Sequence, residues 1–233
     1  MKICFFTENY YKGGLDSFLI NVINCWPDTQ DELILLCNSS HSGIDIIKEK
    51  VNKKLQIKKY CRLFTALIAQ GQGRGKWSRS FLARKFFLIS FLILQYPILF
   101  PWYVLSLIVF FRISGFDRLM VVNGGYPASL LCRSAVIAWG LSGKKPLAVT
   151  NFHSMATNAH YYNALLENVI DALVIRFSSH IIGVSNACLT SLNKRVAFKN
   201  CPKLSYIHNG IEDPTSFLKE DFRAAKSERV MRY

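Results

Sequence analysis

KICFFTENYYKGGLDSFLINVIN, residues 2–24, decides the fold of this chain. It begins with a short apolar run, KICFFT, continues through a polar loop that contains Gly13 and Gly14, and ends in a largely apolar run of helical length. Six residues are enough for a strand and too few for a helix, and a strand that leads directly into a helix is the repeating unit of a parallel sheet. The stretch therefore predicts the first strand, loop and helix of an α/β domain.

The same alternation continues along the chain to about residue 207. Strands are predicted near residues 2–7, 32–37, 55–60, 118–122, 147–151, 180–184 and 204–207. Helices are predicted over residues 15–25, 43–52, 127–142, 161–178 and 185–195. This order predicts an α/β fold with a doubly wound parallel sheet. Because such sheets bind ligands at the carboxyl ends of their strands, we expect functional residues in the loops after residues 7, 122, 151, 184 and 207.

The composition of the chain indicates a large core and one strongly positive segment. The 233 residues are 51% hydrophobic and carry a formal net charge of +14, which excludes disorder as the main state. Residues 48–85 hold twelve basic residues against the single acid Glu49, a local net of +11, and the next acid is Asp117. We expect a positive surface suited to the phosphates of lipids, nucleotides or nucleic acid. The alternative is a solvated face, with a flexible loop around residues 71–77.

The seven cysteines are widely spread and show neither CxxC nor the Cys/His spacing of a zinc site, so no metal site is predicted. A reducing cytoplasm is the simpler interpretation of such a pattern. The N-terminus, MKICFFTENYY, has too short an apolar run for a secretory signal.

Residues 86–111 form an uncharged run, FFLISFLILQYPILFPWYVLSLIVFF, that interrupts the α/β pattern. Pro97 and Pro101 divide it into pieces of about 11 residues, each too short to cross a ~30 Å hydrocarbon core. We therefore expect an inserted apolar helical hairpin that enters one leaflet, beside the basic segment. The alternative is the buried core of a larger assembly. The predicted membrane contacts are Phe86, Phe91, Tyr96, Trp102, Tyr103 and Phe110.

Several loops carry candidate functional residues. His153, in TNFHSMA, follows the fifth predicted strand, where it could exchange a proton or bind a substrate hydroxyl, or serve as a capping or packing residue. The Gly13–Gly14 pair precedes a helix, which is consistent with close approach of a phosphate or a sugar and equally with a tight turn. Ser185 is expected to cap a helix, and HNGIEDP, residues 208–214, reads as a turn.

Several catalytic motifs are absent. GQGRGKW, residues 71–77, has the wrong spacing for a P-loop and no strand before it. The first strand is not followed by GxGxxG, and the chain has neither Asp-x-Asp nor a Ser/His/Asp order with a nucleophile elbow.

Taken in order, the segments resemble the N-terminal domain of the GT-B glycosyltransferases of family 4. The resemblance rests on the Gly13–Gly14 loop, FDRLMVVNGG (116–125), TNFHS (150–154), HIIGVSNACLTSL (180–192) and LSYIHNGIEDP (204–214), and it covers the chain except residues 61–116. It implies a Rossmann-like domain over residues 1–212, in which residues 61–116 are a basic loop and the membrane-associating insertion. Residues 213–233 would be a linker or the start of a C-terminal domain that this chain lacks.

The resemblance also implies a reaction and its residues. A sugar would pass from a nucleotide sugar to an acceptor hydroxyl, with retention of configuration and without a metal or cofactor. His153 would lie beside the transferred sugar or the acceptor. The other implied substrate-binding residues are Gly13, Gly14, Asn123, Ser185, Asn209 and Gly210. Together with the apolar run, the resemblance suggests a lipid-linked acceptor in cell-surface polysaccharide synthesis, at the cytoplasmic face of the membrane.

Two features separate this chain from the family pattern. Family members carry most donor contacts, including a Glu-x7-Glu pair, in a second domain, and Glu212 and Glu220 match only the spacing of that pair. We therefore expect the chain alone not to transfer sugar. A non-catalytic, membrane-associated remnant or scaffold that pairs with a separate donor domain is the alternative function. Nucleic-acid binding is not expected, because the basic segment adjoins an apolar run rather than interleaved aromatics.

Overall fold

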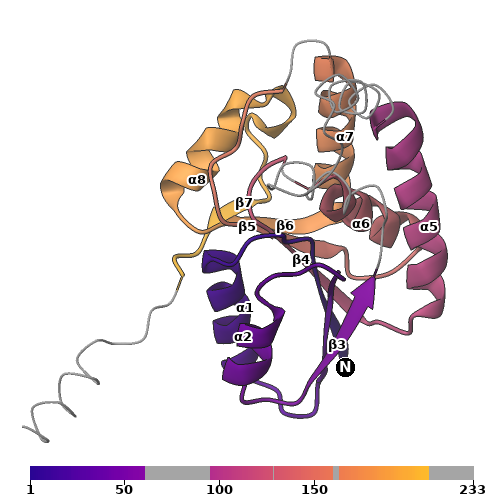
Figure 1. The fold of residues 1–233 in the computed structure, drawn as a ribbon. Helices are drawn as coiled ribbons and strands as arrows, with labels where there is room; N and C mark the ends of the chain where they lie inside the picture. Colours follow the sequence, from indigo (N-terminus) through magenta and orange to yellow (C-terminus); the bar gives the residue numbers. More distant parts are fainter. Residues whose placement is uncertain (61–94, 128, 160–162, 210–233) are drawn as a thin grey trace, which may run out of the picture.

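The computed structural model describes residues 1–60, 95–127, 129–159 and 163–209, which form one seven-stranded sheet between two layers of helices (Figure 1). All neighbouring strands are parallel, and their order is β3-β2-β1-β4-β5-β6-β7. The strands are β1 (Lys2–Thr7), β2 (Glu32–Asn38), β3 (Leu55–Tyr60), β4 (Arg118–Asn123), β5 (Ala148–Phe152), β6 (Ser178–Gly183) and β7 (Leu204–Tyr206). The doubly wound parallel α/β sheet predicted from the sequence is confirmed.

Two groups of helices cover the two faces of the sheet. The helices are α1 (Gly14–Asn24), α2 (Ile44–Lys50), α5 (Phe100–Ile113), α6 (Leu130–Leu141), α7 (Ala164–Phe177) and α8 (Asn186–Ser191), with a π-helical turn η1 (Gln95–Leu99) before α5 and the short 3₁₀ turns η3 (Leu192–Lys194) and η4 (Val196–Phe198) after α8. Helices α1 and α2 lie on one face, and α5, α6 and α7 lie on the other (Figure 1). The predicted helix over 185–195 is thus a short α-helix followed by 3₁₀ turns.

Alternation along the central strands explains this layering. On β1, Ile3 and Phe5 pack in the cluster that contains α1, whereas Cys4 and Phe6 pack in the cluster that contains α6. Because both faces of a doubly wound sheet are buried, its strands read as continuous apolar runs. That is the pattern from which the sequence predicted them.

The structure corrects the predicted hairpin where it describes that segment. Residues 95–113 form one continuous helical segment, η1 and α5, and they are not divided at Pro97 or Pro101. Pro101 is the second residue of α5, next to the junction with the π-helical turn η1 that contains Pro97. Helix α5 is the last part of the connection from β3 to β4 and packs along α6. The second part of the predicted insertion, residues 95–116, therefore belongs to the α/β domain, and residues 61–94 lie outside the described residues.

Two of the predicted membrane contacts, Tyr96 and Tyr103, are buried in the core of the domain. Phe110 is half-buried against Phe111 and Phe116, and its contact with a membrane stays a prediction. Trp102 is exposed as predicted, whereas Phe86 and Phe91 lie outside the described residues. By length and composition Gln95–Ile113 could cross a membrane, with a mean hydropathy of 1.6, but 33% of that stretch is buried inside the domain.

A buried ion cluster ties α7 to the segment that follows α8. Arg195 donates from Nε to Asp171 Oδ2 at 2.7 Å, from Nη1 to the Thr157 carbonyl at 3.0 Å, and from Nη2 to Glu167. The remaining carboxylate oxygens accept from Tyr126 (2.6 Å, to Asp171) and Tyr96 (2.7 Å, to Glu167). Both acids and the guanidinium are almost fully buried, so each charge depends on the others.

We predict that Arg195→Met lowers the free energy of unfolding by about 3–5 kcal/mol, because it leaves two buried carboxylates without their cation. Urea unfolding followed by tryptophan fluorescence measures this change. The matched control is Arg112→Met at the exposed end of α5, which should change the value by less than about 0.5 kcal/mol. A loss below about 1 kcal/mol for Arg195→Met would show that the cluster does not hold α7.

Candidate functional site

The sheet changes winding direction between β1 and β4. These strands are neighbours, yet α1 leaves β1 on one face of the sheet and α6 leaves β4 on the other. Ligands of doubly wound sheets bind beyond the carboxyl ends of the strands at this point. We refer to Thr7, Gly13, Gly14, Asn123, Gly124, Asn151 and His153, which lie at or just beyond those ends, as the switch-point site.

Buried polar atoms without a hydrogen-bond partner gather at this edge of the sheet. Thr7 and Asn151 are both register partners of Val122, so the three side chains point to the face that carries α1. Orphaned buried polar groups are uncommon, and a missing ligand or water is a usual reason for them. The orphaned atoms at the ends of β1, β2 and β5 or in the loops that follow are Thr7 Oγ1, Asn38 Nδ2, His41 Nδ1, Ser42 Oγ, Asn151 Oδ1 and His153 Nε2.

Three glycines leave open space beside these atoms. A Cβ atom added at Gly13, Gly14 or Gly124 would meet no other group within 4 Å. None of the three has the positive φ that favours glycine, and Gly13 is extended at φ 173°. Neither backbone conformation nor internal packing therefore requires glycine here, which argues against the tight-turn interpretation of Gly13 and Gly14. The space beside the pair is open, which is compatible with the approach of a ligand.

Asp16 holds the glycine loop in place. Its carboxylate accepts from Gly13 N–H at 3.0 Å and Asn9 Nδ2 at 3.2 Å, and lies 2.8 Å from His41 Nε2. Burial by itself would raise the pKa of Asp16, but these hydrogen bonds outweigh it and lower the pKa. The carboxylate occupies the Gly13 N–H, so Gly14 and Leu15, which open α1, retain the N–H groups without intrahelical acceptors. Sequence reasoning missed Asp16, although an acid three residues after Gly13 is a capping signal.

His153 is held with its ring against α1. Its backbone N–H donates to the Asn123 carbonyl at 3.2 Å, and its ring meets Phe18 edge-on at 4.5 Å between centroids. Burial lowers the pKa of His153 from 6.5 to about 4. The imidazole is therefore neutral at pH 7, where it can accept or donate a hydrogen bond. As a neutral base it suits a substrate hydroxyl better than it suits an anion.

The other predicted site residues also lie beyond the carboxyl ends of strands, but their burial and hydrogen bonds differ. Asn123 ends β4 and is buried. Ser185 caps α8, as the sequence predicted, with its Oγ accepting the Cys188 N–H at 3.1 Å. Asn209 is exposed beyond β7, and Gly210 lies outside the described residues. The structure thus brings Asn123 and His153 together, while Ser185 already has a structural role.

Glu8 is a further polar residue that sequence reasoning missed. It follows β1 directly, and its carboxylate accepts from Ser129, the N-cap of α6, and from Tyr10 Oη at 2.9 Å. Glu8 therefore links the end of β1 to the start of α6, which lies on the opposite face of the sheet from α1. The sequence could have indicated Glu8, because it directly follows an apolar run of strand length and ligands bind beyond the carboxyl ends of such strands.

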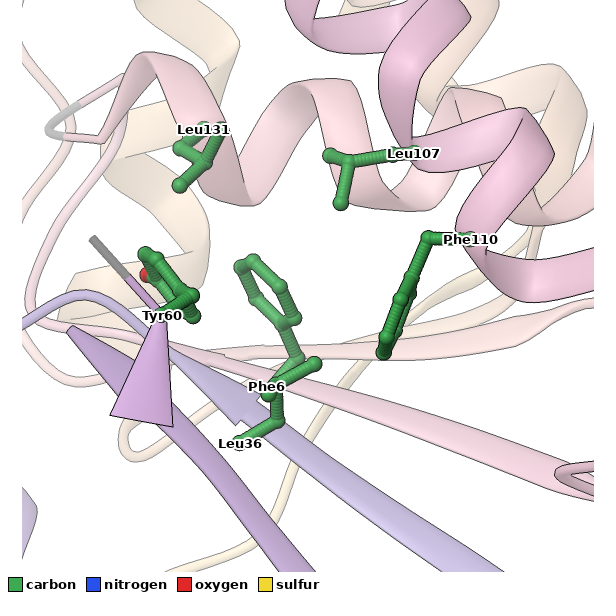
Figure 2. A pocket seen from close by; sticks show the side chains of 6 residues that line it. All are labelled: Phe6, Leu36, Tyr60, Leu107, Phe110 and Leu131. Atoms are coloured by element: carbon green, nitrogen blue, oxygen red, sulfur yellow. The ribbon is translucent and has the colours of Figure 1, made fainter. Parts of the chain in front are cut away.

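An apolar cavity of about 50 Å³ lies between the sheet and helices α5 and α6 (Figure 2). Its one polar lining group, the Tyr60 hydroxyl, donates to the Thr7 carbonyl at 2.9 Å. The cavity therefore offers a ligand no free polar group, unlike the switch-point site. The lining residues are Phe6, Leu36, Tyr60, Leu107, Phe110 and Leu131. Among the described residues, no group of three or more His, Cys, Asp or Glu side chains could hold a metal ion.

We predict that His153→Gln flattens the dependence of stability on acid pH. The folded imidazole resists protonation until about pH 4, whereas the unfolded one binds a proton below about pH 6.5, so wild-type stability is complete above that window and falls as pH drops through it. Urea unfolding between pH 7 and 4 measures the slope. His180→Gln, at an exposed histidine of β6, serves as the control. Equal slopes for wild type and His153→Gln would contradict the lowered pKa of the half-buried His153.

The comparison with known structures includes a distant likeness to a larger protein. No protein-family model matches the chain, and no curated protein matches it either. The crystal structure of Acinetobacter baumannii MurG is similar with a TM-score of 0.43 and 13% sequence identity, over 90% of this chain and 46% of that one. This chain thus spans less than half the length of that protein. A likeness of this size establishes no shared activity, and the fold stands on the chain's own topology.

Proposed function

We propose that this chain is the acceptor-side half of a glycosyltransferase that passes a sugar from a nucleotide sugar to an acceptor hydroxyl. The observation that carries the proposal is the switch-point site: orphaned polar atoms on β1 and β5 face the same layer as α1, and open glycines stand at the start of that helix. A ligand with many hydroxyls and a phosphate matches such a site. The resemblance to GT-B enzymes of family 4 supplies the reaction type.

Each part of the site has a role in this proposal. The free N–H groups at the start of α1 and its positive dipole end bind the diphosphate of the donor, and Gly13 and Gly14 let that group approach the backbone. His153 Nε2 accepts a hydrogen bond from a hydroxyl of the sugar or acceptor. In this proposal Asn123 and Asn209 bind further sugar hydroxyls or the donor. The reaction retains configuration without a metal or cofactor, and a second domain completes the donor site.

Helix α5 supports the proposal that the enzyme works at an anionic membrane, on the cytoplasmic side. One face of its helical segment is apolar and exposed, with spacings of three or four residues that place the side chains in one stripe. The stripe consists of Ile98 (56% exposed), Trp102 (62%), Leu105 (61%), Val109 (61%) and Ile113 (79%). This feature favours a lipid-linked acceptor, as in polysaccharide synthesis. It would serve a membrane-bound scaffold without catalytic activity equally well, which is the second candidate function.

Exposed cations near the stripe match an anionic leaflet. Arg112 is exposed at the end of α5. Lys58 is exposed on β3 two residues before Tyr60, so it points to the face of the sheet that α5 covers. An apolar helical face beside cations binds anionic lipid through burial and charge together.

Sugar transfer to lipid-extractable acceptors tests the enzymatic proposal. Membranes from cells that express the chain, alone or with a neighbouring reading frame, are supplied with a panel of labelled nucleotide sugars. We expect labelled lipid with one donor when the neighbouring reading frame is also expressed, and none from the chain alone. His153→Gln should lower this transfer roughly 100-fold, and His180→Gln should not lower it. Gly14→Ala should lower transfer about tenfold without lowering stability, because its methyl group enters space open to the ligand. Membrane binding without transfer from any donor would favour the scaffold.

Sedimentation with vesicles tests the membrane contact. Trp102→Asp combined with Leu105→Asp should weaken binding to vesicles that contain phosphatidylglycerol at least tenfold, because two exposed apolar side chains no longer enter the lipid. The matched control places the same changes at Leu165 and Leu166, which are exposed on α7. If both double variants bind equally well, α5 is not the membrane contact.

A further inference from the structure

Two hydrogen bonds tie the end of β2 and the turn that leads into α2 to the glycine loop after β1. Asn38, the last residue of β2, accepts from the Asn9 N–H at 2.9 Å through its Oδ1. In the turn, His41 Nε2 lies 2.8 Å from Asp16 Oδ1. His41 stands outside the switch-point site, yet it contacts the carboxylate that holds Gly13.

His41 and Asp16 form a buried pair, with 3% of each residue exposed. The lowered pKa of Asp16 keeps its carboxyl group ionised at pH 7, and a carboxylate only accepts hydrogen bonds, so His41 Nε2 carries the proton between them. The other ring nitrogen, Nδ1, is buried and has no hydrogen-bond partner in the described part of the chain. The bond to Asp16 is therefore the one hydrogen bond of this ring among those residues.

Gly43 lets the turn approach this carboxylate closely. A Cβ atom added at Gly43 would overlap the Asp16 side chain, whereas one added at Gly13 or Gly14 would meet no other group within 4 Å. The backbone at Gly43, with φ −88° and ψ 0°, lacks the positive φ that favours glycine. Close packing against Asp16 is therefore what glycine provides at this position.

A carboxylate at the start of a helix competes with an anionic ligand for the same N–H groups and repels that ligand. Both oxygens of Asp16 already have donors. Oδ2 accepts from the Gly13 N–H at 3.0 Å, and Oδ1 accepts from Asn9 Nδ2 at 3.2 Å and from His41. These three hydrogen bonds offset part of the negative charge and occupy the carboxylate. The N–H groups of the first two residues of α1 are thereby left to a ligand.

We propose that His41 is a positioning residue for a nucleoside diphosphate at the start of α1. It holds the Asp16 carboxylate, which in turn holds Gly13, so that the diphosphate meets the N–H groups of the helix without a competing anion. The inference rests on the proposed function, because it takes the diphosphate of the donor as the ligand of this loop. Without His41 the carboxylate loses a donor, and the diphosphate should bind more weakly.

Calorimetric titration of the full chain with inorganic pyrophosphate tests this role. His41→Leu removes the donor and should raise the Kd roughly tenfold, the effect of one hydrogen bond to a charged group. His41→Gln keeps an N–H donor at a similar distance along the side chain, so its Kd should stay within about threefold of the wild-type value. Ile47→Ala is the control for stability. Ile47 is buried in the apolar core under α2, so this variant should have a lower Tm and an unchanged Kd.

Gly43→Ala is a second variant, and it removes no polar group. Its methyl group displaces the Asp16 carboxylate, so the Kd for pyrophosphate should rise as it does in His41→Leu. Nitrogen NMR of the wild type tests the pair without a ligand. His41 Nε2 should carry a proton that exchanges slowly with water, because the pair is buried.

The possible outcomes separate the role of His41 from the proposed function. If the wild type does not bind pyrophosphate, the loop does not bind a diphosphate and both proposals fail. If the wild type binds it and the Kd is unchanged in His41→Leu and Gly43→Ala, only the role of His41 is contradicted. The same conclusion follows if Ile47→Ala loses as much affinity as His41→Leu, or if His41 Nε2 carries no proton.

Discussion

The structure depends on the reversal of winding between β1 and β4. Crossovers between parallel strands are right-handed. The step from β1 to β2 and the step from β4 to β5 run in opposite directions across the sheet, so their helices α1 and α6 must lie on opposite faces. The loops after β1 and β4 therefore diverge at the carboxyl edge of two adjacent strands. Gly13 and Gly14 from the first loop and Asn123 from the second belong to the same edge for this reason. Glu8 bridges the divergence through its hydrogen bond with Ser129.

Buried polar groups in this domain fall into two kinds with different consequences. Arg195 and Asp16 have their hydrogen bonds fulfilled by neighbouring groups, and they hold α7 and the glycine loop in single positions. Thr7, Asn151 and His153 retain atoms without partners. The polar groups that have all their hydrogen bonds make the domain rigid. A rigid domain can hold polar groups that lack partners in fixed positions, where a ligand can bind them. The unfulfilled groups are where a ligand gains most on binding, because it supplies bonds that the protein alone lacks.

Helix α5 shows where hydropathy is ambiguous. An uncharged run has the same composition whether its side chains enter lipid or the core of a domain, and only neighbouring elements separate the two cases. Tyr103 and Leu107 are buried in the core, while Trp102 and Val109 are exposed, so the two faces of this one helix have different surroundings. Pro97 lies in the π-helical turn and Pro101 is the second residue of α5, so neither proline divides the segment.

The sequence by itself determined the order of strands and helices, since each strand is an apolar run that both faces of the sheet bury. It also determined the edge at which the candidate residues lie, because parallel strands all end on one side. Only the tertiary structure decided which residues there are free to act. Gly13 and His41 converge on one carboxylate, and Arg195 pairs with both acids of α7. These outcomes depend on contacts between residues far apart in the chain, and local pattern contains no information about such partners.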